Sequence, residues 1–327
     1  MKKLLFCTIC IATALMMISC GGKKDGPASE VLSKKSFSSV ISKYETVGDF
    51  HDGVAVVSLE WRKTGVIDTK GNEIIECKYF LIEDSCDGML RFKDGSNYGY
   101  FNTKGEVVVE AGKYDNVSNY SCGLGLVEKE DKYGYIDTKG VEIIPCNFDR
   151  AFSFSEDVAL VRMNDKYGYI DLKGNYIIEP SYDDAEHFSC GVAITCKGSN
   201  EYVVDRKGNV VYTADKRSTF IDEQFAYNLI PMMQENGRSL VAGYINIKGE
   251  VALPFEYQYA TGFIDGTALV MKDNKVYQIN TKGEILGEET SPEVLEEFLD
   301  DATYFIDLSA DVLVKLLGEE YFEDLDW

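Results

Sequence analysis

The residues of this chain that could do chemistry are mostly carboxylates. The chain holds 55 Asp and Glu against 33 Lys and Arg, with two histidines and nine cysteines. Paired carboxylates act as acid and base in glycoside hydrolysis, a Ser or Cys nucleophile needs a neighbouring base, and clustered Cys, His or Asp bind metals. Which of these chemistries applies depends on the elements that position the residues.

Many of the acids recur at one position of a repeated motif. The segment "YGYIDTKG" at 133–140 returns as "YGYIDLKG" at 167–174. The Lys-Gly glycines follow one another at intervals of 34, 35, 34, 34, 41 and 34 residues. Such a period is typical of repeat proteins, in which each copy buries its apolar face against its neighbours. The seven copies carry these Asp or Asn and Gly pairs: Asp68 and Gly71, Asn102 and Gly105, Asp137 and Gly140, Asp171 and Gly174, Asp205 and Gly208, Asn246 and Gly249, Asn280 and Gly283.

We interpret these pairs as hairpin-turn residues. Asp or Asn at the first position of a turn accepts hydrogen bonds from the following backbone, and Gly at the fourth position takes a positive φ without steric cost. Three of the seven copies carry Asn, which titrates neither as an acid nor as a base. The position therefore serves turn geometry, and we predict no catalytic residue and no enzyme activity.

The remaining candidates for chemistry are scattered. His51 and His187 lie in connectors where other copies hold turn residues, and no HExxH, phosphate-binding glycine loop or nucleophile elbow is present. The cysteines after Cys20 occupy ordinary repeat positions without metal-ligand spacing, so single thiols are expected. An oxidising compartment could pair some of them, Cys86 with Cys122 for instance, but the connectivity stays open. We expect no metal and no cofactor.

The repeat predicts an all-β fold. An alternating strand precedes each Lys-Gly, with Tyr167 and Tyr169 on one face and Ile170 on the other, and short apolar runs lie before and after it. We therefore expect about seven three-stranded antiparallel copies between Phe50 and Leu286. The short period favours an open β superhelix, or solenoid, and a seven-bladed propeller-like ring is the alternative. Tyr100, Tyr135, Tyr169 and Tyr244 share one repeat position and are expected in the core.

The motif "YGYIDTKG", followed by "EIIP", "FD" and "FS", resembles the bacterial WG-repeat family over roughly 64–287. Where that family has Trp-Gly, this chain has Tyr98-Gly99, Tyr133-Gly134 and Tyr167-Gly168, whereas Tyr202 and Tyr277 replace the glycine in the fifth and seventh copies. The resemblance implies a β-rich binding repeat, and therefore interaction rather than catalysis.

The two ends of the chain differ from the repeat. Residues 1–19 read as a signal peptide that ends before "CGG", a pattern similar to bacterial lipoprotein signals, so Cys20 is the predicted lipidation site and 20–39 a tether. The repeat domain is expected over 40–287. Residues 288–327 form an acidic segment, in which Ser291 and Ser309 are N-cap candidates for two short helices that cap the last copy.

These features predict a lipid-anchored, non-catalytic scaffold of the bacterial cell envelope. The outer membrane is the expected location, and the sequence leaves the membrane face open. A protein partner is expected, and a glycan-binding or glycan-degrading envelope lipoprotein is the alternative. The net charge of -22 disfavours nucleic acid and leaves the lipid as the membrane contact. The longer fifth interval places an insertion at 225–239, a predicted contact loop carrying Tyr227, Met232 and Met233.

Overall fold

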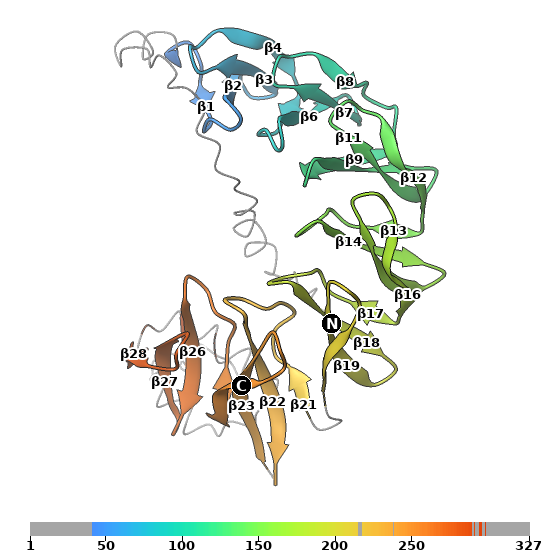
Figure 1. The fold of residues 1–327 in the computed structure, drawn as a ribbon. Helices are drawn as coiled ribbons and strands as arrows, with labels where there is room; N and C mark the ends of the chain where they lie inside the picture. The colour runs from blue at the N-terminus through green and yellow to red at the C-terminus, as the bar shows by residue number, and fades with distance from the viewer. Residues whose placement is uncertain are drawn as a thin grey trace, which may run out of the picture. The chain divides into compact units, whose positions relative to one another are not determined.

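The computed structural model describes residues 41–214, 218–237, 239–289, 291, 294, 295 and 298, and the elements they form are β-strands (Figure 1). The chain divides into two compact units, Met1–Lys113 (unit 1) and Tyr114–Trp327 (unit 2), each of which is described by itself. The expected signal peptide, Cys20 and the tether lie outside the described residues.

The strands form seven four-stranded antiparallel sheets within the described ranges, each with its strands in chain order. Sheets 1 and 2 belong to unit 1, and sheets 3 to 7 belong to unit 2. The strands of unit 1 are β1 (Thr46–Val47), β2 (Val54–Glu60), β3 (Lys63–Asp68), β4 (Glu73–Tyr79), β5 (Leu81–Ile82), β6 (Met89–Asp94), β7 (Asn97–Asn102) and β8 (Val107–Val109). Those of unit 2 are β9 (Asn116–Ser121), β10 (Leu124–Lys129), β11 (Lys132–Asp137), β12 (Glu142–Phe148), β13 (Arg150–Ala151), β14 (Val158–Met163), β15 (Lys166–Asp171), β16 (Tyr176–Tyr182), β17 (Asp184–Ala185), β18 (Val192–Lys197), β19 (Asn200–Asp205), β20 (Val210–Thr213), β21 (Ser218–Phe220), β22 (Leu229–Asn236), β23 (Ser239–Asn246), β24 (Val251–Tyr257), β25 (Tyr259–Ala260), β26 (Thr267–Lys272), β27 (Lys275–Asn280) and β28 (Ile285–Glu288).

The prediction of three strands per copy is wrong, because each sheet begins with an additional strand. In five of the seven sheets this first strand has only two residues, as in Arg150–Ala151 and Asp184–Ala185. Two residues are too few to show an alternating pattern. The sequence analysis therefore assigned them to the connector between copies.

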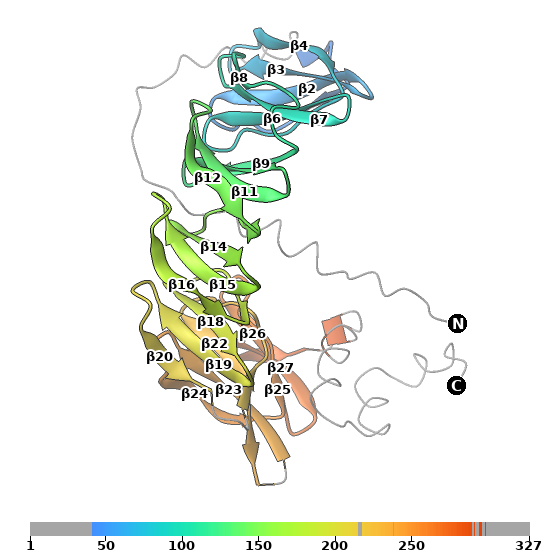
Figure 2. The same ribbon diagram turned by 90° about the vertical axis from the view of Figure 1, so that its right-hand side faces the viewer.

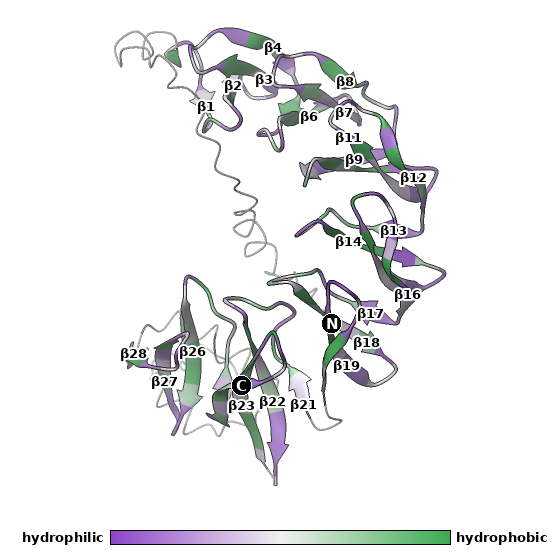
Figure 3. Ribbon diagram, in the orientation of Figure 1, coloured by the Kyte–Doolittle hydropathy of each residue, from purple (hydrophilic) through white to green (hydrophobic). Residues whose placement is uncertain are grey.

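The core lies between consecutive sheets, so a sheet inside a unit is buried on both faces. In sheet 4, Tyr169 packs with Phe188 of the sheet 5 segment, whereas Ile170 packs with residues of sheet 3, and both side chains are fully buried. The opposite orientation of these two residues was predicted. The Tyr169 hydroxyl also donates a 2.6 Å hydrogen bond to the Glu186 carbonyl across the boundary. Within unit 2, Figure 2 shows successive sheets side by side, and Figure 3 shows hydrophobic strands joined by hydrophilic turns.

The repeated Asp or Asn and Gly shape the turn between the third and fourth strands. In sheet 4, Asp171 Oδ1 accepts hydrogen bonds of 2.9 Å from the backbone N–H groups of Lys173 and Asn175. The same two bonds form in all seven copies. The seven turn glycines have φ between +75° and +82°, a range that suits glycine.

The glycine of the Tyr-Gly pair has a separate role. In sheet 4, Tyr167 pairs with Tyr182 and Tyr169 pairs with Ile178, so three residues of β16 pass opposite the single Gly168. A Cβ placed on Gly168 would lie 2.5 Å from the Ile178 carbonyl oxygen, and the equivalent distances at Gly65 and Gly134 are also 2.5 Å. Only glycine fits beneath this bulge.

The fifth and seventh copies lack the bulge where they lack the glycine. Tyr202 pairs with Thr213 and the next residue, Val203, pairs with Tyr212, so no extra residue passes opposite Tyr202. Tyr277 in the seventh copy pairs with Glu288 in the same regular way. The fourth strands β20 and β28 have four residues each, against seven in β4, β12, β16 and β24, but β8 has only three although its copy keeps Gly99.

The two terminal sheets are covered by flanking chain. Ile41 and Tyr44 pack on the outer face of sheet 1. At the other end, the buried Phe298 ring lies edge-on to Tyr259 of β25, with centroids 5.3 Å apart. The Leu295 N–H donates to the Ser291 carbonyl, the spacing of a helical turn, but the predicted second helix and most of the first lie outside the described residues.

We predict that Gly168→Ala lowers the free energy of unfolding by about 2–3 kcal/mol, because the new Cβ forces β16 away from β15. The denaturant midpoint of the purified protein measures this loss. The matched control is Gly287→Ala, whose Cβ would meet no atom within 4 Å. Equal midpoints for the two variants would contradict the close approach at Gly168.

Candidate functional site

The repeated acids are occupied by their own turns and do not converge. Each of the seven lies in a different sheet, where its carboxylate or amide oxygen accepts two backbone hydrogen bonds. The bond from the Asn175 side chain holds the pKa of Asp171 below its ordinary value, so this group stays ionised. Across the described part of the chain, no cluster of three or more His, Cys, Asp or Glu could bind a metal ion.

His187 and the described cysteines are buried or partly buried, whereas His51 is exposed and forms a bridge with Val54. The His187 ring lies edge-on to Phe152 at 5.2 Å between sheets 4 and 5, and burial lowers its pKa. The six described cysteines are free thiols, so the Cys86–Cys122 pairing is not formed. Burial raises the pKa of Cys146 and Cys196 to about 11, which keeps both thiols protonated and weakly nucleophilic at neutral pH.

The expected contact loop at 225–239 is mostly strand. Met232 and Met233 lie in β22 and are fully buried, because the strands β22 and β23 extend to eight residues each and continue the sheet. These two side chains pack the core and do not face a partner. Tyr227, which precedes β22, has 52% of its surface exposed and remains available for contact.

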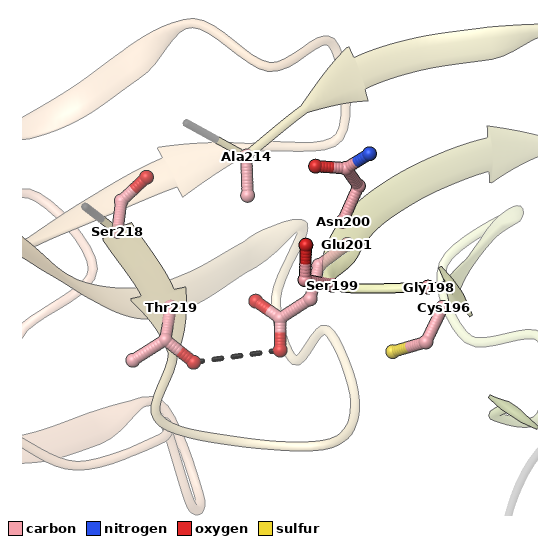
Figure 4. Close-up of a pocket in the computed structure, with 8 residues that line it drawn as sticks. All are labelled: Cys196, Gly198, Ser199, Asn200, Glu201, Ala214, Ser218 and Thr219. Carbon is pink, nitrogen blue, oxygen red and sulfur yellow. Dashed lines mark hydrogen bonds between the residues drawn. The ribbon is translucent and has the colours of Figure 1, made fainter. Parts of the chain in front are cut away.

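Two adjoining pockets lie between sheets 5 and 6 of unit 2. The larger, of about 300 Å³, is lined by β18, β19 and β21, and the Thr219 hydroxyl donates to Glu201 Oε1 at its wall (Figure 4). The second, of about 220 Å³, shares Cys196 and Glu201 with the first. Its other lining residues are Asp184, Ala185, Glu186, Ile194, Phe220, Ile221, Asp222 and Glu223.

The second pocket gathers carboxylates that sequence reasoning did not single out. Burial, together with the charges of Glu223 and Asp184, raises the pKa of Glu186 to about 7, and burial also raises the pKa of Asp222. Glu186 therefore holds a proton at mildly acidic pH. The sequence signal was weak, since these acids belong to the connectors at 183–186 and 222–223 that vary between copies.

Unit 1 carries the most exposed aromatic residue of the described structure. Trp61, at the tip of the β2–β3 hairpin, is 77% exposed, and Phe80 between β4 and β5 is 41% exposed. The Arg62 guanidinium lies between them, 3.7 Å from the Trp61 ring centroid and 4.7 Å from that of Phe80. Lys93 continues the series, 5.7 Å from Phe80 and 5.0 Å from Tyr98.

Arg91 completes this surface at 5.0 Å from the Tyr98 ring centroid. We name the surface the aromatic–cation ladder and define it by Trp61, Arg62, Phe80, Lys93, Tyr98 and Arg91. It spans both sheets of unit 1. The sequence signal that could have revealed it is the dipeptide Trp61-Arg62 at a hairpin tip.

These features define a class of protein built from consecutive four-stranded β-meanders, with glycine under a bulge of the fourth strand. The family described as "WG containing repeat" matches residues 65–97, 98–133, 133–167, 167–200 and 243–275, more than half of the chain. The chain belongs to this family. The matched ranges omit the fifth and seventh glycine motifs, where Tyr202 and Tyr277 replace glycine and the bulge is absent.

Solved structures give more distant likenesses. The computationally designed protein Ika8 is 11% identical, with 76% of this chain and 87% of that chain covered and a TM-score of 0.38. BamB from Moraxella catarrhalis is 14% identical over 73% of this chain and 83% of its own, with a TM-score of 0.35. A eukaryotic initiation factor is 11% identical over 76% and 78%, with a TM-score of 0.43. A comparison with curated proteins finds no match.

Within the described residues no helix is both long and apolar enough to span a bilayer.

The raised pKa of Glu186 predicts a pH-dependent stability. The ordinary pKa is 4.5 and the folded value is about 7, so the folded state binds the proton more tightly and the free energy of unfolding falls as pH rises between these values. Glu186→Gln removes this penalty. We expect the free energy of unfolding of the variant to be higher than that of the wild type by roughly 1–3 kcal/mol at about pH 8. The difference vanishes near pH 4.

Thermal or denaturant unfolding across this pH range measures the effect. The matched control is Glu179→Gln, which changes an exposed carboxylate on β16 of the neighbouring sheet. A pH-independent difference between wild type and Glu186→Gln would show that the pKa of Glu186 is the same in the folded and unfolded protein, and would contradict the prediction.

Proposed function

We propose that this protein is a lipid-anchored, non-catalytic scaffold of the bacterial cell envelope that binds another macromolecule, most readily a protein. One observation carries the proposal. The polar residues that recur between copies form turn and inter-sheet hydrogen bonds, as Asp171 and Tyr169 do in sheet 4. The shared residues of the repeat therefore stabilise the fold. The hairpin tips, which vary between copies, are left to contact the surroundings.

The anchoring part of the proposal rests on the sequence. The apolar run after Lys2 and Lys3, ending at Ser19-Cys20, supports export and lipidation, and the outer membrane is the location we favour. We also favour an open arrangement of the seven sheets over a closed ring. An open array offers an extended surface of the kind that repeat proteins use for macromolecular partners.

We predict that Cys20→Ser transfers the protein from the membrane fraction to the soluble fraction of the cells. Removing the lipid removes the hydrophobic energy that holds the chain at the bilayer. Fractionation followed by immunoblotting measures the distribution. The control is Cys77→Ser, which replaces a cysteine of the repeat domain and leaves the lipidation site unchanged. Retention of Cys20→Ser in the membrane fraction after a high-salt wash, which weakens contacts that depend on charge, would contradict the anchor.

The same soluble variant tests partner binding. We expect it to bind one protein reproducibly in a pull-down from solubilised cell envelopes. Tyr227→Ala is one of the surface variants compared with it in this assay. A glycan array distinguishes the alternative, in which exposed aromatic side chains stack on sugar rings. Binding to a glycan class without a protein partner would replace the leading proposal with that alternative.

A further inference from the structure

The aromatic–cation ladder exposes apolar surface that the fold does not require. At the equivalent hairpin tip the other copies carry Gly95-Ser96, Glu130-Asp131, Asn164-Asp165, Gly198-Ser199, Gly237-Arg238 and Asp273-Asn274. Small or polar residues therefore suffice to close this hairpin. Trp61 at 77% exposure and the adjoining Leu59 at 44% leave large apolar side chains in water.

The backbone at the tip is also unfavourable for its residue. Arg62 has φ +67°, in the left-handed region that Gly, Asn and Asp tolerate best. The side chain placed there contacts two ring faces, Trp61 and Phe80. The tip thus combines an exposed indole with a cation held against it, and Arg62 takes the positive φ that other copies give to Asp131, Asp165 and Asn274 at the same position.

The ladder is locally cationic in an acidic protein. Residues 41–113 contain nine Lys and Arg against thirteen Asp and Glu, so this segment is nearly as acidic per residue as the whole chain, whose net charge is -22, and the ladder itself holds three of the nine cations. Among the ion pairs of the described residues, Arg91 pairs with Glu83, whereas Arg62 and Lys93 take part in none. These two cations are therefore available to an anionic partner.

We propose that the aromatic–cation ladder is a membrane-contact surface that docks on anionic phospholipid headgroups, with Trp61, Phe80 and Leu59 at the boundary between headgroups and acyl chains. Tryptophan rings concentrate at that boundary, and Lys and Arg next to a bilayer are attracted by anionic lipids. The distant acids of the chain do not prevent this contact, since charges are screened over about 8 Å at physiological ionic strength.

The position of the ladder in the chain supports a membrane as the occupant. The inference rests on the proposed function in one respect, the lipid at Cys20. The twenty residues 21–40 separate that lipid from unit 1 and span at most about 70 Å however they fold. A hairpin tip with an apolar end and flanking cations suits a planar anionic surface, whereas the pockets that would suit a glycan lie in unit 2.

The test uses the full mature chain with Cys20→Ser and Trp327→Phe, which leaves Trp61 as the one tryptophan. Vesicles of equimolar phosphatidylglycerol and phosphatidylcholine are compared with vesicles of phosphatidylcholine alone. We expect a blue shift of Trp61 fluorescence and quenching by brominated acyl chains on the anionic vesicles only. Arg62→Glu weakens binding by roughly 10- to 30-fold, because one attraction is lost and one repulsion is gained.

Lys104→Glu is the matched control, since it makes the same charge change at an exposed turn of unit 1 outside the ladder, and we expect it to bind within about twofold of the parent protein. Trp61→Ala, followed by co-sedimentation, gives a second readout at a site too exposed to affect folding.

No spectral shift on anionic vesicles, or equal losses for Arg62→Glu and Lys104→Glu, would overturn the assignment. A shift caused instead by an acidic glycan or an acidic peptide would assign the ladder to that class and reject the membrane. Because every protein in this test lacks Cys20, its failure is separate from failure of the lipid anchor, which cell fractionation measures.

Discussion

The close approach of the fourth strand to the third at one glycine determines the form of the five copies that carry it. At Gly168 the backbone of β16 leaves no room for a Cβ, which would lie 2.5 Å from the Ile178 oxygen. This contact lets three residues of β16 bulge outward between the pairs Tyr167–Tyr182 and Tyr169–Ile178. Backbone geometry therefore requires the glycine of the Tyr-Gly pair. The aromatic residue before it is easier to replace.

The second constraint is burial on both faces. A sheet inside a unit has core residues on each side, so Tyr169 and Ile170 are both fully buried although they are adjacent in sequence. No single copy can satisfy this arrangement alone, because half of its apolar surface would remain in water. The tyrosine hydroxyls at Tyr135, Tyr169 and Tyr244 add a directional bond to the next segment, each reaching a backbone carbonyl that would otherwise need another donor.

The sequence was sufficient for the elements with strong local signals. The turn residues, the opposed faces of Tyr169 and Ile170 and the family followed from motifs long enough to show their pattern. The two-residue first strands could not be found, since their pairing partners lie about ten residues away and impose the structure from outside. Met232 and Met233 were assigned to a loop because the longer interval was attributed to an insertion, whereas much of the excess extends β22 and β23. The aromatic–cation ladder depends on contacts between two sheets, which no local pattern encodes.

Because the shared residues serve folding, the departures from the repeat identify where function can differ, and the two kinds of departure are not equivalent. Tyr202 replaces glycine in sheet 5, β20 shortens to four residues, and the pocket beside Ala214 and Ser218 lies where the longer strand would continue. The Trp61-Arg62 tip changes no strand pairing beyond its own hairpin and leaves an indole in water. A departure that costs solvation and backbone freedom without improving the fold is better explained by a surface that it contacts.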